Sequence, residues 1–320
     1  MQLRLGRWFR GFMGLVRHGG LIGIHGSARV SVQGVFAFGQ RVSIGRNSII
    51  QVPKNSTLRL GDRVHIGREV EVSPATEISI GNHTSVQDRC NFLGQVAVGA
   101  HCIFAPNVFI SSRIHQFMER PAWLIRDQDE LLADSSHVAA NPRCLPVHID
   151  EDCWVGINAV IMRGVTLGRG CVVGANSVVT KSFPPYSVVA GAPARLLRSR
   201  LAFHPPRSIS SAVPEHLPYF YSGFDLRQRA LAASSTGMKA CGRFRLALDC
   251  SAARSIVLDV HADQPLKLAC LRQEQLLPVG AQQVSFELAA LPPDGLIAME
   301  ATDRQGRPCR VAIRSASVRD

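Results

Sequence analysis

The stretch that decides the fold is VHIDEDCWVGINAVIMRGVTLGRGCVVGANSVVTKSFPPYSVVAGAPARLLR, residues 147–198. Within it a large aliphatic residue returns at every sixth position: Ile149, Val155, Ile161, Leu167, Val173 and Val179. The same step occurs upstream at Ile80, Val86, Phe92, Val98, Phe104 and Ile110, and over a shorter run at Leu60, Ile66, Val72 and Ile78. Neither a helix nor an alternating strand has this period. It suits a three-sided coil whose short sides each point one side chain inward, with successive coils stacked through parallel-sheet hydrogen bonds.

The corners of such a coil are visible in the same alignment. One corner position holds Asn47, Arg63, His83, His101, Asp152 and Gly170. All but Arg63 are residue types that tolerate a positive φ, as a tight corner requires. The next position holds the small residues Ser48, Val64, Thr84, Cys102, Cys153 and Cys171, which suit a crowded inner corner. The chain has nine cysteines, an odd number, and no C-x-x-C pair, so we expect reduced, mostly buried thiols.

Three motifs in this stretch carry a family resemblance. They are Trp154-Val155-Gly156, Gly164-Val165-Thr166-Leu167-Gly168 and Ala190-Gly191-Ala192-Pro193-Ala194. They are similar to signatures of the galactoside, maltose and polysaccharide O-acetyltransferase branch of the hexapeptide-repeat acyltransferases. The resemblance implies an all-β chain with a left-handed parallel β-helix over 21–198. It also implies a homotrimer with active sites between subunits, acetyl-CoA as donor, a saccharide acceptor and no metal.

The repeat is interrupted between Ile110 and Ile149, and this interruption is where we expect the chemistry. It runs to Ile110 and resumes at Ile149, so residues 111–148 form a loop that leaves a rigid scaffold, a common location for functional residues. His115 is in register with the family's catalytic histidine. Transfer to a hydroxyl group needs a base that works near neutral pH, and imidazole meets that need. We therefore predict His115 as the general base.

The residue that orients His115 is not evident from the sequence. Many polysaccharide O-acetyltransferases have an Asp-His-x-His pattern here, but this chain has Ser112 and Arg113 at the first two places. His137 or His148 could contribute to catalysis together with His115.

For the donor, the resemblance implies a row of residues along acetyl-CoA. Ala175 would follow the pantetheine arm, and Thr180 and Lys181 the adenine end, while Arg195 and Arg198 would approach the 3′-phosphate, because phosphates need cations. The remaining two candidates are Trp154, which could line the acyl pocket or pack at a subunit boundary, and Ile157, which stands where relatives often have a small polar residue.

Two alternative hypotheses remain open, one for the type of site and one for the acceptor. His83 and His101 are one coil apart, as in a zinc-binding β-helix that resembles the γ-type carbonic anhydrases, although no third ligand is evident. For the acceptor, we expect a sugar of a cell-surface polysaccharide or of its precursor. The alternatives are an amino sugar, an antibiotic or serine.

The remaining segments define the domain organisation. Residues 1–20 form an amphipathic segment, and its helical spacing over 1–18, with apolar residues on one face and arginines around them, predicts either a peripheral membrane helix or a helix packed on protein. We expect a linker over 199–225, rich in proline, and a small antiparallel β-sandwich-like domain over 226–320, of no evident catalytic role.

Charge and hydropathy narrow the partners and the location. Among 320 residues, 36 Lys and Arg against 24 Asp and Glu give a formal charge of +12, which favours anionic ligands. No nucleic-acid recognition motif accompanies that charge, so we expect no nucleic acid. No run is apolar enough to span a bilayer, and no signal-peptide core is evident, so we expect a cytoplasmic protein, with peripheral contact at the inner membrane face as a possibility.

Overall fold

The fold is known from a computed structural model, which describes residues 13–17, 20–115, 117–118, 120–133, 144–225, 237–251, 253–288 and 295–320. The chain divides into two compact units, Met1–Ala202 and Phe203–Asp320, which are described separately. Among the described residues, no helix has the length and apolar character needed to cross a membrane.

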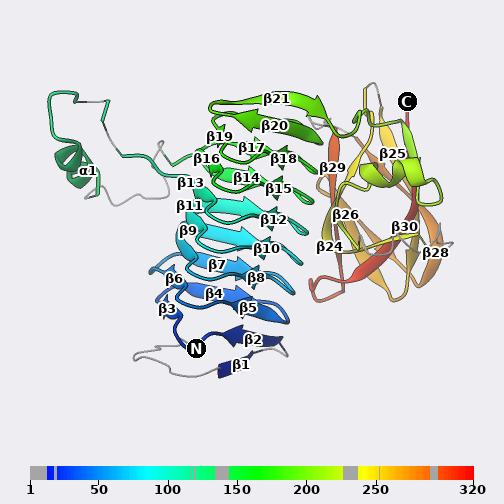
Figure 1. Cartoon of the computed structure of the whole chain (residues 1–320). Coiled ribbons are helices and arrows are strands. Elements are labelled where there is room, and N and C mark those ends of the chain that lie inside the picture. Colours follow the sequence, from blue (N-terminus) through cyan, green and yellow to red (C-terminus); the bar gives the residue numbers. More distant parts are fainter. Residues whose placement is uncertain are drawn as a thin grey trace. The chain divides into compact units, whose positions relative to one another are not determined.

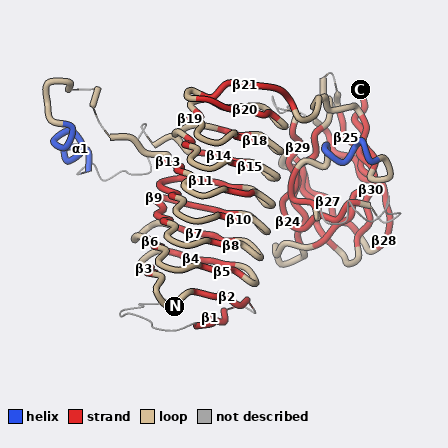
Figure 2. Tube along the Cα trace, viewed as in Figure 1, coloured by secondary structure: helices blue, strands red, loops and turns tan. Residues whose placement is uncertain are grey.

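The first unit is a parallel β-helix with three faces (Figures 1 and 2). Face 1 contains β1 (Met13–Arg17), β2 (Gly20–Ile24), β5 (Val42–Ile44), β8 (His65–Ile66), β10 (Ser85–Val86), β12 (Ile103–Phe104), β15 (Trp154–Val155), β18 (Val172–Val173), β20 (Ser187–Gly191) and β21 (Ala194–Ser199). Its first pair and its last pair, β1–β2 and β20–β21, are antiparallel. The other neighbours on this face are parallel, so the β-helix predicted from the period of six is confirmed.

The other two faces share two long strands that turn a corner. Face 2 contains β3 (Arg29–Val32), β6 (Ile49–Val52), the first parts of β9 (Glu71–Ile80) and β11 (Asn91–Val98), then β13 (Phe109–Ser111), β16 (Val160–Ile161) and β19 (Val178–Val179). Face 3 contains β4 (Val35–Phe38), β7 (Thr57–Leu60), the second parts of β9 and β11, then β14 (Val147–Ile149) and β17 (Thr166–Leu167). The β9–β11 register shifts between Gly94 and Val96, at the corner between these faces.

The predicted corner positions are confirmed. Asn47, Arg63, His83, His101, Asp152 and Gly170 all have a positive φ, between 55° and 71°. Arg63 adopts the same conformation as the others, because the stacked coils above and below fix the backbone despite a cost of about 1–2 kcal/mol. The following residue is buried in every case: Ser48, Val64, Thr84, Cys102, Cys153 and Cys171. Burial raises the pKa of the Cys90 thiol to about 11, so such core thiols stay protonated.

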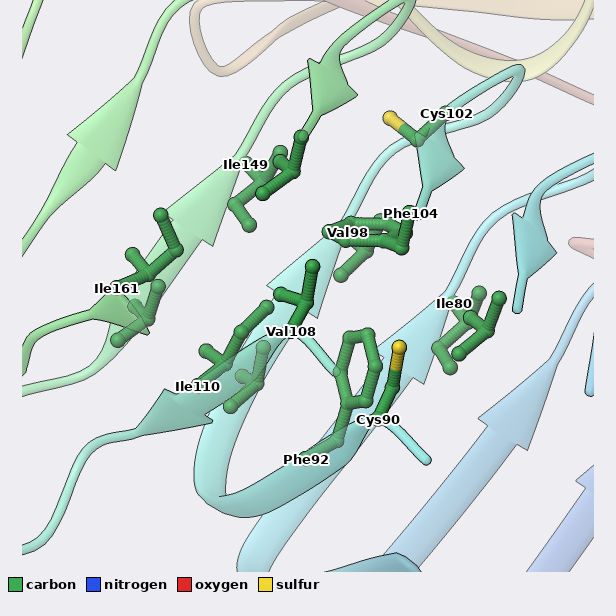
Figure 3. Close-up of a cluster of buried hydrophobic side chains, with 14 of the residues drawn as sticks. Ile80, Cys90, Phe92, Val98, Cys102, Phe104, Val108, Ile110, Ile149 and Ile161 are labelled. Atoms are coloured by element: carbon green, nitrogen blue, oxygen red, sulfur yellow. The ribbon is translucent and has the colours of Figure 1, made fainter. Parts of the chain in front are cut away.

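The core of the β-helix is a column of inward side chains, one layer for each coil (Figure 3). Phe92 and Phe104 meet edge to face in it, with ring centroids 5.2 Å apart. Ile80, Val98 and Ile149 stack beside them on face 3. Because each layer contacts only its neighbours, the column acts as a rigid rod from which a loop can leave at one edge.

The second unit is an antiparallel β domain, which confirms the predicted fold class. Its strands are β22 (Ser208–Ser210), β23 (Ser222–Phe224), β24 (Met238–Ala247), β25 (Ser255–Ala262), β26 (Leu266–Cys270), β27 (Gln273–Leu277), β28 (Gly280–Glu287), β29 (Leu296–Thr302) and β30 (Arg310–Arg319). They form one sheet of order β27-β26-β29-β24-β30-β25-β28, with β22 on β30 and β23 on β24. The sheet curls nearly closed around a single core.

Two segments differ from their expected conformation. In 199–225, expected as a linker, β22, the 3-10 helix η2 (Pro214–Tyr219) and β23 belong to the second unit, because Ile209, Phe220 and Phe224 are buried in its core. At the N-terminus, residues 13–17 form β1, which pairs with β2, in place of the end of a helix. In the rest of the amphipathic segment, residues 1–12 and 18–19 lie outside the described residues.

Candidate active site

The interrupting loop leaves the β-helix at the edge between faces 2 and 3, directly after β13. Its two ends meet at a neck, where Ser112 Oγ lies 3.0 Å from Cys144 Sγ. The Gln95 backbone N–H donates to Ser112 Oγ at 2.7 Å. Gly94 makes this possible: its φ is +93°, and a Cβ there would lie 2.2 Å from Ser112 Oγ. The neck therefore fixes where the loop starts, three residues before His115.

His115 has a carboxylate partner that the sequence reasoning missed. Its Nδ1 lies 2.6 Å from Asp129 Oδ2, and Asp129 belongs to helix α1 (Ile125–Ala133). The imidazole is 84% exposed and the carboxylate 34% exposed. Donation from Nδ1–H to the carboxylate leaves the Nε2 lone pair facing outward, which is the tautomer that a general base needs.

Helix α1 is tied to the loop segment that precedes it. The buried Gln128 side chain accepts a hydrogen bond from the Arg120 backbone N–H at 3.2 Å and donates to the Trp123 carbonyl at 3.3 Å. The Arg120 guanidinium lies 4.3 Å from the centre of the Trp123 ring. These contacts set the direction of α1, and with it the position of Asp129 beside His115.

The other candidates for orienting His115 have different positions. Ser112 points inward and is fully buried, while Arg113 is exposed, so neither replaces the acidic residue of the family pattern. His148 is exposed on β14, on face 3. His137 lies outside the described residues. The only sequence signal for Asp129 was its place in the acidic stretch Asp127–Glu130, which does not indicate by itself which carboxylate faces the histidine.

Thr180 and Lys181 lie on the same edge of the β-helix as the loop neck. Val160 pairs with Phe109 below it and with Val178 above it, so the residues that follow β19 stack over those that follow β13. At the usual spacing of neighbouring strands, two coils correspond to about 10 Å. Both side chains are exposed, and Lys181 Nζ lies 5.6 Å from the Phe183 ring centre. A cation thus stands beside the neck of the histidine loop.

Trp154, Ile157 and Ala175 lie on a different part of the coil. Trp154 is on face 1, and Ile157 and Ala175 are on the edge between faces 1 and 2, one coil apart and both exposed. This edge is held by a ladder of asparagine side chains, in which Asn107 donates to Asn158 and Asn158 donates to Asn176, each at 2.9 Å.

Arg195 and Arg198 form a third group, on the exposed surface of β21 at the end of face 1. Arg195 pairs with Ala190 and Arg198 with Val188, both on β20. The structure therefore brings Thr180 and Lys181 to the edge of the histidine loop, but it does not bring the other five donor candidates to that edge within one chain.

The predicted stacking of His83 on His101 is present in the structure. The His83 and His101 rings are parallel within 4°, with centroids 5.1 Å apart. Over the described part of the chain, no group of three or more His, Cys, Asp or Glu side chains is placed to hold a metal ion.

Comparison with known proteins identifies the repeat. Residues 146–181 match the family described as the hexapeptide repeat of succinyl-transferase. The chain is 30% identical over 162 residues to a probable acetyltransferase of Mycobacterium tuberculosis, covering 51% of this chain and 43% of that protein. It is 29% identical over 145 residues to a putative colanic acid biosynthesis acetyltransferase of Escherichia coli, covering 45% and 70%. To the galactoside O-acetyltransferase of Escherichia coli it is 30% identical over 156 residues, covering 49% and 63%.

The three-faced coil and this repeat define a hexapeptide-repeat protein. The relatives named as acetyltransferases support the resemblance to the hexapeptide-repeat acyltransferases that the motifs predict. The match spans roughly half of this chain and less than half of the first of these relatives.

Proposed function

We propose that the protein transfers an acetyl group from acetyl-CoA to a hydroxyl group of a saccharide, with His115 as the general base. The observation that carries this proposal is the 2.6 Å contact between His115 Nδ1 and Asp129 Oδ2, on a loop that leaves a hexapeptide-repeat coil. An exposed imidazole whose Nδ1 is held by a carboxylate is equipped to accept a proton at Nε2.

The reaction balances with one proton shuttled by His115. Nε2 takes the proton of the acceptor hydroxyl as its oxygen attacks the thioester carbonyl carbon. The new C–O bond forms, the C–S bond breaks, and the proton passes to the departing thiolate. Asp129 acts as a positioning residue, because it holds the ring in one tautomer and stabilises the imidazolium that forms between the two proton transfers.

The donor would lie along the edge above the loop neck. Lys181 supplies a cation there, and guanidinium and ammonium groups suit the phosphates of CoA. Trp154, Ile157 and Ala175 lie on another edge, and Arg195 and Arg198 on β21. We therefore propose that a homotrimer completes the site, with one copy's histidine loop facing the neighbouring copy's edge. The 84% exposure of His115 within a single chain supports this arrangement.

The acceptor we propose is a sugar of a cell-surface polysaccharide or its precursor. Two of the relatives are named for colanic acid biosynthesis and for a galactoside, and both are saccharide systems. The formal charge of +12 favours anionic partners such as acidic glycans. Such a reaction would take place in the cytoplasm, where acetyl-CoA is available, with contact at the inner membrane face through residues 1–18 as part of the same proposal.

The test is an assay of acetyl transfer from acetyl-CoA to a panel of sugars and nucleotide sugars, in which release of the free CoA thiol is measured. We expect His115→Ala to lower the rate by about 10²–10⁴-fold, the usual contribution of a general base. Asp129→Asn should lower kcat, leave KM for acetyl-CoA unchanged and alter the pH profile. The control is His204→Ala, an exposed histidine of the second unit. Full activity in His115→Ala would overturn the assignment.

A further inference from the structure

The second unit contains a hollow of about 440 Å³ on the outer surface of its sheet. It lies over three adjacent strands, β24, β29 and β26, with the β26–β27 turn at one end and Ser222 of β23 on another side. Its volume falls in the range of small-molecule sites. All lining residues belong to the second unit, so the hollow is formed by that unit alone.

The hollow exists because small side chains face outward between long ones. Ala298 of β29 lies directly opposite Arg245 of β24, and Ala269 of β26 lies opposite Glu300 of β29. Successive outward positions of neighbouring strands are about 5 Å apart, so an alanine beside an arginine leaves an apolar floor beneath a charged wall. The floor suits the C–H face of a sugar ring, and the walls suit a charged group.

Three guanidinium groups line the hollow against a single carboxylate. The cations are Arg243, Arg245 and Arg272, and the carboxylate is Glu300, whose Oε1 lies 3.3 Å from Arg243 Nε. The nearby Glu274 pairs with Lys267 at 3.0 Å and does not line the hollow. The lining therefore carries an excess of positive charge, which favours an anionic ligand.

Arg245 is held in place before any ligand arrives. Its Nε donates to Ser222 Oγ at 2.8 Å, and its guanidinium lies 5.0 Å from the centre of the buried Tyr221 ring. Arg272 is set at the tip of a two-residue turn, in which Leu271 and Arg272 both have positive φ, 46° and 71°. An arginine side chain that is held in advance, as Arg245 is, binds carboxylate or phosphate oxygens with little loss of side-chain entropy.

We propose that this hollow binds an anionic sugar residue, with its carboxylate or phosphate on Arg245 and Arg272 and its ring over Ala298 and Ala269. This binding site is independent of acetyl transfer and needs neither His115 nor acetyl-CoA. It would give the protein a second point of contact with an acidic glycan.

The test is titration of the full chain with glucuronic acid, glucose 1-phosphate or glucose. Binding of each sugar is measured by saturation-transfer NMR. We expect at least one anionic sugar to bind at least 10-fold more tightly than glucose. Binding of glucuronic acid alone would assign a carboxylate, and binding of glucose 1-phosphate alone would assign a phosphate. No binding of either anion, or equal binding of glucose, would overturn the proposal.

Variants locate the binding. Arg245→Ala and Arg272→Ala should each weaken the anionic sugar by about 10-fold or more, the usual effect of removing a charged hydrogen-bond partner. Ala298→Phe should abolish binding by filling the hollow, and because Ala298 is exposed the sheet should still fold. Arg304→Ala, in the exposed turn between β29 and β30, is the matched charge control and should bind normally.

His115→Ala separates this proposal from the proposed function. That variant should lose acetyl transfer and keep sugar binding in the hollow. Loss of binding in His115→Ala, or unchanged binding in Ala298→Phe, would show that the sugar binds outside the hollow and would contradict the proposal.

Discussion

The β-helix and the second unit are both β-structures with apolar cores, but they are built on different rules. In the β-helix a step of six residues sets the inward side chains from Ile80 to Ile110 and from Ile149 to Val179, so the coils there repeat one another. In the second unit no period exists, and long antiparallel strands are matched by individual registers. The difference explains where each candidate site lies. In the β-helix it is at the interruption between Ile110 and Ile149, and in the second unit it is where small and large side chains meet across three strands.

The largest expected effects come from the two cores. Phe92 and Phe244 are both buried, and each packs edge to face or nearly so on another phenylalanine, Phe104 or Phe224. Replacing either by Ala should destabilise its own unit by about 3–5 kcal/mol. Hydrogen exchange should distinguish the units: Phe92→Ala should expose amides mainly in adjacent coils, because coils contact only their neighbours.

Phe244→Ala should instead raise exchange across the whole second unit, because its sheet closes around one core. Uniform loss of protection throughout the β-helix in Phe92→Ala would contradict the layer-by-layer description of that unit.

Gly94 in the β-helix and Gly306 in the second unit both have a positive φ, but only Gly94 is in close contact with another residue. Gly94→Ala places a Cβ 2.2 Å from Ser112 Oγ at φ +93°, so it must displace the neck that carries His115. We expect a loss of about 2 kcal/mol or more in the stability of the β-helix, and reduced acetyl transfer. Gly306→Ala, at φ +76° with open space around it, should cost only about 1 kcal/mol in the second unit. Denaturant unfolding and the transfer assay check both.

If Gly94→Ala and Gly306→Ala cost the same and transfer is unaffected, the neck does not position the loop. The pair is matched because both glycines have positive φ, and the difference between them isolates the contact with Ser112.

The smallest effect concerns two aspartates with lowered pKa. Hydrogen bonds from the Arg68 side chain and backbone N–H lower the pKa of Asp88 and link two coils of the β-helix. In the second unit, hydrogen bonds from Arg307, first its backbone N–H, lower the pKa of Asp303 within one turn. A lowered pKa stabilises the fold above the unfolded value of about 4, and this contribution is lost as the pH falls through the folded pKa.

Asp88→Asn should therefore cost less than about 1 kcal/mol at pH 7 and make the acid limb of the stability curve shallower. Urea unfolding between pH 7 and pH 3 measures this. An acid limb identical to that of the unchanged protein would show that Asp88 does not link the coils energetically.

The β-helix could be predicted from the sequence because its six-residue step of apolar residues is repeated many times. The positions of Ile149 and Val173 follow from a step of six, and even Arg63 could be placed at a corner by its neighbours in the alignment. The interruption after Ile110 and the place of His115 follow from the same regularity. Asp129 could not be assigned in this way, because its contact with His115 depends on how Gln128 ties α1 to the loop, and this is a tertiary contact without a period.

For the second unit, the sequence predicts that strands are present but not the order in which they pair. Its apolar runs indicate antiparallel β-structure, but β27 (Gln273–Leu277) is mostly polar and gives little strand signal. The order of strands, and therefore the meeting of Arg245 with Ala298, depends on pairings between residues far apart in the sequence. A hollow of that origin is visible only once the register is known.

The most direct test of the central claim is calorimetric titration of acetyl-CoA into the full chain, because it requires no knowledge of the acceptor. We predict binding in the micromolar range, weakened about 10-fold by Lys181→Ala or Arg195→Ala and unchanged by Arg304→Ala. Absence of binding to the folded protein would contradict acetyl transfer from CoA by this β-helix.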